Sequence, residues 1–120
     1  MTSSSKTNFI KTINHRQPDK VVVDFGSTAV TGIHVRIVEK LREHFGLEKR
    51  PVKVIEPYQM LGELDSELIK AMDIDVIGIF GQRNMFGVPN ENWKVHKTLW
   101  GQEYCFRENS TTPILQMEIY

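Results

Sequence analysis

The chain has 120 residues, of which 40% are hydrophobic, and its fifteen basic residues balance fifteen acidic ones. This length fits one small domain or part of a larger one, and the composition excludes wholesale disorder. The zero net charge argues against a nucleic-acid partner, and the single cysteine excludes an internal disulfide. No apolar run is long enough to cross a bilayer, and the first residues lack a secretory signal. We therefore expect a cytoplasmic protein with no membrane partner.

The first 45 residues predict two helices with one strand between them. Residues 1–7 are rich in Ser, Thr and Lys and predict a disordered lead-in. Asn8 is a favourable N-cap for a short helix over residues 9–15. Residues 21–25 form a mostly β-branched run, which is typical of a strand covered on both faces. A long amphipathic helix is predicted over about residues 30–45, with Gly46 as its C′ residue.

The rest of the chain predicts two more strands and one more helix. Residues 52–55 and 76–80 are the strands, and a helix beginning near Gly62 or Asp65 ends at about Met72. Alternating strands and helices of this length are typical of parallel βαβ units. Residues 81–120 are irregular or form a hairpin, in which residues 93–99 pair with residues 103–106.

Three parallel strands do not complete a known α/β architecture, because a doubly wound sheet has five or six strands and an eightfold barrel takes about 250 residues. The third strand would expose an unpaired backbone edge and a bare apolar face, which favours association. The pattern therefore indicates the opening of a larger α/β fold. A self-standing small α/β binding or oligomerisation module without catalytic activity is the alternative.

Several segments resemble a known family in the same order along the chain, over about 80 residues. They are NHRQPDK at residues 14–20 leading into VVVDF, GSTAVTGIH at 26–34, EPYQMLGE at 56–63 and DIDVIG at 73–78. Together they resemble the amino-terminal part of the uroporphyrinogen decarboxylase superfamily. The resemblance is closer to the branch related to cobalamin-dependent methyltransferases.

The resemblance implies an incomplete TIM-type (β/α)8 barrel, with residues 8–120 as its amino-terminal helix, about three βα units and the hairpin. Members of the family decarboxylate a tetrapyrrole or move a methyl group to or from a corrinoid or thiol, so the intact protein would act on a small molecule. The decarboxylases carry an arginine-rich segment after the first strand, where this chain has none. We expect the chain to be inactive alone and to associate with the remainder of the barrel or with itself.

In a barrel, the chemistry lies at the carboxyl ends of the strands. The polar residues near these positions are the substrate-binding candidates: Asp24, Ser27, Thr28, His34, Glu56 and Arg83. The alternative for Ser27 and Thr28 is to cap the following helix, and the alternative for Glu56 is a solvated turn. Arg83 would bind an anionic group or form a surface ion pair.

No metal site is expected, because the four histidines and the one cysteine include no pair at ligand spacing. We expect no cofactor in this chain. The resemblance implies that zinc and a corrinoid serve the intact methyltransferase relatives, whose zinc ligands lie in the later part of the barrel.

Overall fold

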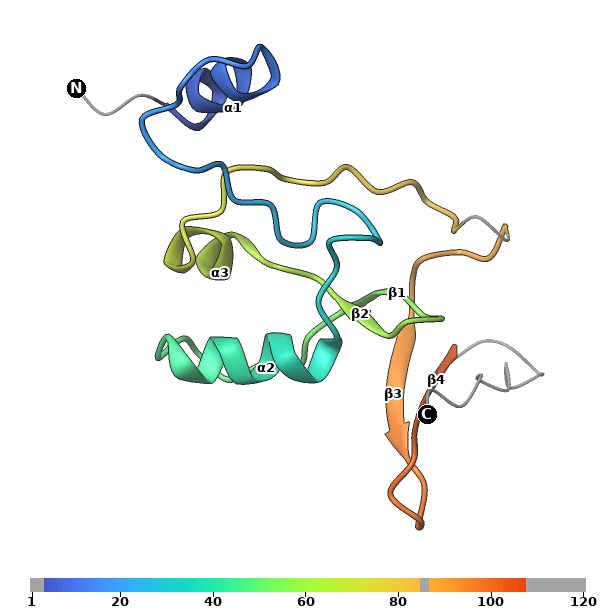
Figure 1. Ribbon diagram of the computed structural model, residues 1–120. Helices are drawn as coiled ribbons and strands as arrows, with labels where there is room; N and C mark the ends of the chain where they lie inside the picture. Colours follow the sequence, from blue (N-terminus) through green and yellow to red (C-terminus); the bar gives the residue numbers. More distant parts are fainter. Residues whose placement is uncertain (1–3, 85–86, 108–120) are drawn as a thin grey trace.

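The computed structural model describes residues 4–84 and 87–107, and it shows a mixed α/β fold (Figure 1). Its helices are α1 (Ser5–Ile13), α2 (Val35–His44) and α3 (Ser66–Ala71). Two antiparallel sheets of two strands each complete it: β1 (Val54–Glu56) with β2 (Leu61–Gly62), and β3 (Trp93–Lys97) with β4 (Glu103–Arg107). The described residues form no closed barrel. No helix among them is long and apolar enough to span a membrane.

Helix α1 begins earlier than the sequence predicts. Ser4 is its N-cap, and the Ser4 hydroxyl accepts the Thr7 N–H at 3.3 Å. The expected lead-in is therefore wrong for residues 4–7, because serine caps a helix as well as asparagine does. Asn8 is buried inside the helix, where its side-chain oxygen accepts the Asp19 N–H at 3.0 Å and fixes the chain after the helix. The first three residues of the lead-in lie outside the described residues.

Helix α2 begins later than predicted, at Val35 rather than near residue 30. His34 is the N-cap, and its Nδ1 atom accepts the Arg36 N–H at 3.2 Å. The preceding residues form a turn closed by a 2.8 Å bond from the Gly26 N–H to the Thr31 carbonyl. At the other end Gly46 has φ +66° and follows the C-cap, so its predicted role is confirmed.

Of the three predicted parallel strands, only the second becomes a strand, and its partner β2 is antiparallel. Residues 21–25 and 76–80 are extended but form no ladder, so those two strand predictions are wrong. The two segments nevertheless lie side by side and run in the same direction (Figure 1). The Asp75 N–H donates to the Val23 carbonyl at 2.9 Å, and further along Gly78 lies against Ser27. A ladder does not form because the Asp75 side chain, not a backbone carbonyl, accepts the Val23 N–H.

The predicted carboxyl-terminal hairpin is confirmed. β3 and β4 pair in register from Trp93 opposite Arg107 to Lys97 opposite Glu103. The indole N–H of Trp93 donates to the Pro89 carbonyl at 2.8 Å, which places this large side chain inside the fold. The main apolar core joins α2 to both sheets, and it consists of Val35, Val54, Met60, Trp93 and Cys105.

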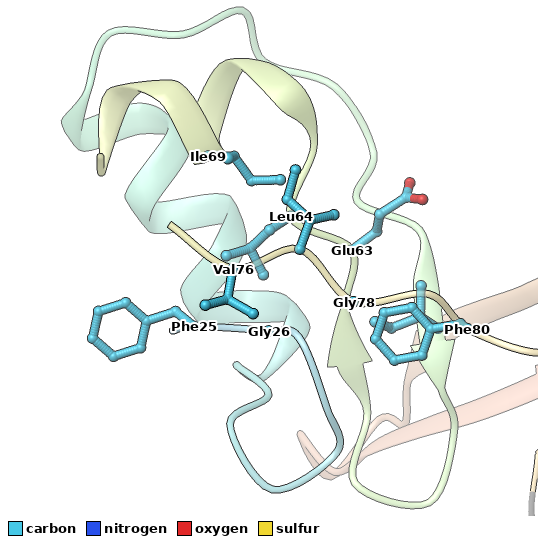
Figure 2. A pocket seen from close by; sticks show the side chains of 10 residues that line it. Phe25, Gly26, Glu63, Leu64, Ile69, Val76, Gly78 and Phe80 are labelled. Carbon is cyan, nitrogen blue, oxygen red and sulfur yellow. The ribbon is translucent and has the colours of Figure 1, made fainter. Parts of the chain in front are cut away.

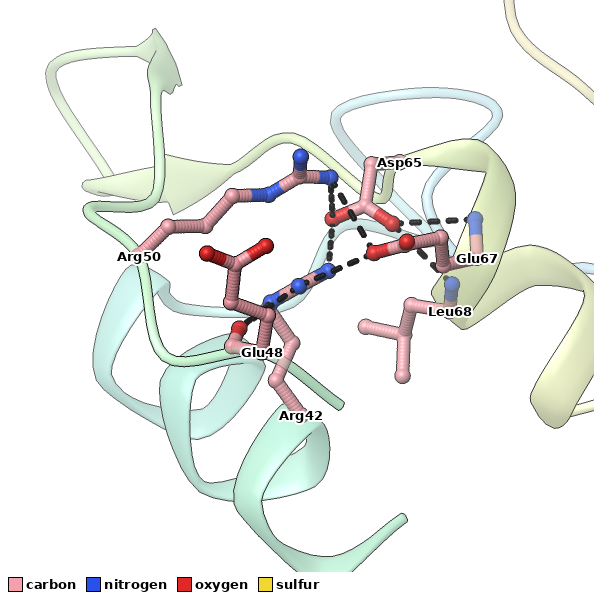
Figure 3. A network of polar contacts seen from close by, with 6 residues as sticks. All are labelled: Arg42, Glu48, Arg50, Asp65, Glu67 and Leu68. Carbon is pink, nitrogen blue, oxygen red and sulfur yellow. Dashed lines mark hydrogen bonds and ion pairs between the residues drawn. The ribbon is translucent and has the colours of Figure 1, made fainter. Parts of the chain in front are cut away.

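A buried guanidinium fixes α3 against α2 (Figure 3). Only 2% of Arg42 is exposed, and it forms an ion pair with Asp65 and a second with Glu67 at 3.1 Å. Asp65 is also the N-cap of α3, because its Oδ1 atom accepts the N–H groups of Glu67 and Leu68 at 3.0 Å. Burial acts to raise the pKa of Asp65, but the Leu68 N–H, Arg50 and Arg42 together hold it below its ordinary value.

A buried carboxylate fixes α1 and the two extended segments. The Asp75 side chain is fully buried, and it accepts the Ser5 hydroxyl at 2.5 Å and the Val23 N–H at 3.0 Å. Lys20 completes the cluster at 3.1 Å. The Ser5 hydroxyl and the Val23 N–H lower the pKa of Asp75 against the effect of burial, and Lys20 adds to them.

We predict that Asp75→Ala lowers the free energy of unfolding by about 2–3 kcal/mol, because it leaves buried donors without an acceptor. Urea unfolding followed by circular dichroism measures this loss. Asp73→Asn is the control, since Asp73 binds the same Lys20 but its side chain is 83% exposed, and asparagine tolerates the left-handed φ of +52° at this position. Its effect should be much smaller.

Wild type and Asp75→Ala together also test how the stability of the fold depends on pH. Because the pKa of Asp75 is lowered in the fold, its contribution to stability is present at neutral pH. It is lost when acid protonates the carboxylate below about pH 4. The stability difference between wild type and Asp75→Ala should therefore narrow at low pH, and a constant difference from pH 7 to pH 3 would contradict this role.

Candidate functional site

A pocket of about 140 Å³ lies between the ends of the first two predicted strand segments and the length of the third (Figure 2). Phe25 and Gly26 line it from the first segment, Ile55 from the second, and residues 76–78 with Phe80 from the third. Glu63, Leu64 and Ile69 complete the lining. The sequence predicts this convergence of segment ends, but it does not single out Glu63 or Leu64. The only signal for those two is their place directly after β2.

The lining side chains are apolar apart from Glu63, whose side chain lies at the exposed rim. Because Gly26 and Gly78 lack a Cβ, the Leu64 side chain lies close to the first and the Ser27 backbone lies close to the second. The lining side chains are suited to contact a small apolar group, with one carboxylate beside it. The six substrate-binding candidates do not line it.

The structure brings Asp24, Ser27 and Thr28 together in the turn that follows Phe25. The Asp24 carboxylate accepts the Ser27 hydroxyl at 2.6 Å and the Ser27 N–H at 3.2 Å. Thr28 exchanges hydrogen bonds with Thr31 in the same turn. Because α2 begins at Val35, Ser27 and Thr28 do not cap it, and that alternative is wrong. Their polar groups stabilise the turn beside the pocket.

His34 and Glu56 lie on opposite sides of Leu61. Glu56 pairs with Leu61 in the first sheet, and His34 forms an isolated antiparallel bridge to it. The Glu56 carboxylate accepts the Tyr58 N–H at 3.1 Å and the Gln59 N–H at 2.7 Å. Glu56 therefore closes the turn between β1 and β2, as the alternative interpretation of this residue predicts.

Arg83 lies in the loop that precedes β3. Its guanidinium donates to the Gly87 carbonyl at 2.7 Å, and its backbone bridges Pro89. Through these two contacts Arg83 holds the loop that precedes β3.

Within residues 4–84 and 87–107, no three His, Cys, Asp or Glu side chains lie close enough to hold a metal ion. Cys105 is buried on β4. Burial raises the pKa of its thiol to about 11, and the negative charges of Glu56 and Glu103 add to the effect. The thiol is therefore protonated at neutral pH and is a poor nucleophile.

Comparisons with known proteins give no match to this chain among family models, curated proteins or solved structures.

We predict that Gly78→Ala destabilises the site, because a Cβ at this position would lie 2.1 Å from the Ser27 carbonyl oxygen. Separating the two segments should cost about 1–3 kcal/mol of unfolding free energy. Gly81→Ala is the matched control, since its Cβ would meet nothing closer than the Arg83 carbonyl oxygen at 3.5 Å. Equal losses in the two variants, measured by urea unfolding, would contradict the close approach of Gly78 and Ser27.

We predict that iodoacetamide labels Cys105 at pH 8 at least about 100-fold more slowly in the folded protein than in urea. The thiolate is scarce when the pKa is about 11, whereas an unfolded cysteine has a pKa of about 8.5. Mass spectrometry gives both rates. The folded rate should rise with pH up to about pH 11 as long as the fold persists. Similar rates in the two states at pH 8 would show that the thiol is accessible and ionised.

Proposed function

We propose that this chain is the amino-terminal part of a (β/α)8 barrel of the uroporphyrinogen decarboxylase superfamily, in the branch related to cobalamin-dependent methyltransferases. One observation carries the proposal. Three apolar segments meet around a single pocket, the first two with their ends at Phe25 and Ile55 and the third along its length from Val76 to Phe80. Convergence of segment ends on one site is the arrangement that a barrel uses for chemistry.

The direction and the exposure of the segments support the same proposal. Residues 21–27 and 75–78 run in the same direction, as the parallel strands of a barrel do. The third segment also exposes 69% of Ile77 and all of Ile79. An apolar strand of an α/β barrel is covered on both faces, so further barrel units would bury these side chains.

In the proposed barrel, the turn that holds Asp24, Ser27 and Thr28 borders the substrate site. Its hydroxyl groups are suited to bind a carboxylate of a small substrate once they exchange their present partners. The reaction would be decarboxylation of a tetrapyrrole or transfer of a methyl group to or from a corrinoid or thiol. The zinc site of a methyltransferase relative would lie in the later part of the barrel, so we expect this chain to be inactive alone. The proposed protein is cytoplasmic.

Co-expression tests the proposal. The partner is the carboxyl-terminal part of a barrel from this family, lacking its own first three βα units. We predict a complex in which the amide groups of residues 76–80 exchange at least about 100-fold more slowly than in the 120-residue chain alone. Mass spectrometry measures the exchange at low micromolar concentration. The chain alone should show no tetrapyrrole decarboxylation and no methyl transfer.

A carboxyl-terminal part of an unrelated TIM barrel serves as the control, and it should give neither a complex nor protection. Failure of the family partner to form a complex would contradict membership of the family. Turnover by the 120-residue chain alone would contradict the claim that it is inactive.

A self-standing binding module is the second candidate, and the shared core of α2 and both sheets favours it. A module of this kind unfolds in one sharp, cooperative transition as a monomer. A part of a larger barrel unfolds broadly or aggregates, because its apolar segment stays exposed. Calorimetry combined with light scattering distinguishes the two candidates.

A further inference from the structure

Residues 76–80 present an open backbone edge. Among the described residues, no hydrogen bond joins a backbone N–H or C=O of these five residues to another group. Hydrogen bonds to the backbone occur directly before and after this segment. The Asp75 N–H donates to the Val23 carbonyl, and the Asn90 side chain donates to the Gly81 carbonyl. Consecutive extended residues with free donors and acceptors are a template for pairing with another strand.

The side chains of this edge differ in exposure. Val76, Ile77, Gly78 and Phe80 line the pocket in Figure 2, but Ile77 is still 69% exposed and Ile79 is fully exposed. Ile and Val are favoured in strands because their branched side chains pack on a pleated surface. The edge therefore offers two isoleucines to the partner strand.

The charges at the two ends of the edge decide the direction of the partner. Asp73 and Asp75 lie before the edge, and Lys20 forms an ion pair with both, so one net negative charge remains at this end. Arg83 lies after the edge. One end is thus acidic and the other basic. A parallel copy would bring like charges together, whereas an antiparallel copy brings Asp73 of one chain near Arg83 of the other.

We propose that residues 76–80 pair antiparallel with the same segment of a second copy of this chain, with Gly78 at the centre of the pair. In this register Ile77 of each copy lies opposite Ile79 of the other, and the two cross-strand pairs bury the exposed isoleucines. The contact is self-complementary, as a two-fold dimer requires.

The size of the edge sets the strength of the dimer. Stable protein interfaces bury about 1,200–2,000 Å², and an edge of five residues provides less. The dimer is therefore weak and depends on concentration. The proposal does not rest on membership of the decarboxylase superfamily, because the open edge and the end charges belong to the chain itself.

Sedimentation velocity of the 120-residue chain between about 10 µM and 1 mM tests the proposal, since this range spans the affinities expected of small interfaces. The expected result is a monomer at the low end and a dimer at the high end. Ile79→Lys should abolish the dimer, because it places a charge in the strand pair. Leu99→Lys is the matched control, since Leu99 is equally exposed on the β3–β4 hairpin, and it should leave the dimer unchanged.

A charge exchange tests the direction of the pair. Asp73→Lys and Arg83→Asp should each weaken the dimer about tenfold or more, and the double variant should recover it. Circular dichroism verifies that every variant is folded, and Ile79→Lys alters a fully exposed side chain. A monomer at all concentrations, or association that Ile79→Lys leaves unchanged, overturns the proposal. Association without recovery in the double variant overturns the antiparallel arrangement.

Discussion

The buried carboxylate of Asp75 is the interaction on which the amino-terminal half of the structure depends. It joins Ser5 of α1, the extended backbone at Val23 and the ammonium group of Lys20. Removing a carboxylate from water is costly, and several strong donors are needed to offset that cost. Only one backbone hydrogen bond otherwise links residues 21–25 to residues 75–80. This cluster thus links the two extended segments that line the pocket.

The two halves of the molecule are stabilised in different ways. The half that contains α2, β1 and the hairpin has an apolar core around Val35, Val54 and Trp93. Helices α1 and α3 are also held by buried charged groups, since Arg42 of α2 binds α3 and Asp75 binds α1. The radius of gyration of 16.7 Å exceeds the value of about 14 Å expected for a compact domain of this length. The apolar residues that remain exposed are consistent with this open shape.

The sequence predicts α2, α3 and the hairpin well, because the signals for these elements are local. Helical spacing identifies α2, Asp65 is a strong N-cap for α3, and Gly101 allows the hairpin turn with φ +84°. The strands are predicted less well, because a strand exists only when its partner is present. Residues 76–80 have every strand-forming property, yet no neighbouring backbone in the described residues pairs with them.

The candidate site shows a similar division. The convergence of segment ends follows from the order of elements, so the place of the pocket is predictable. The roles of Ser27, Glu56 and Arg83 are not, because each is set by a hydrogen bond to a group a few residues away. Such side-chain contacts compete with any function of the residue and leave no periodic signal in the sequence.

The spacing of contacts along the chain orders the steps of folding. Gly62 donates to the Ile33 carbonyl, and a Cβ at Gly62 would lie 3.0 Å from the Val35 Cα, so α2 and β2 meet across fewer than thirty residues. The bond between Ser5 and Asp75 spans 70 residues. Loops of greater length close at a greater entropic cost. During synthesis on the ribosome, α2 can thus dock on the β1–β2 sheet early. Helix α1 cannot dock until the chain has emerged past Asp75.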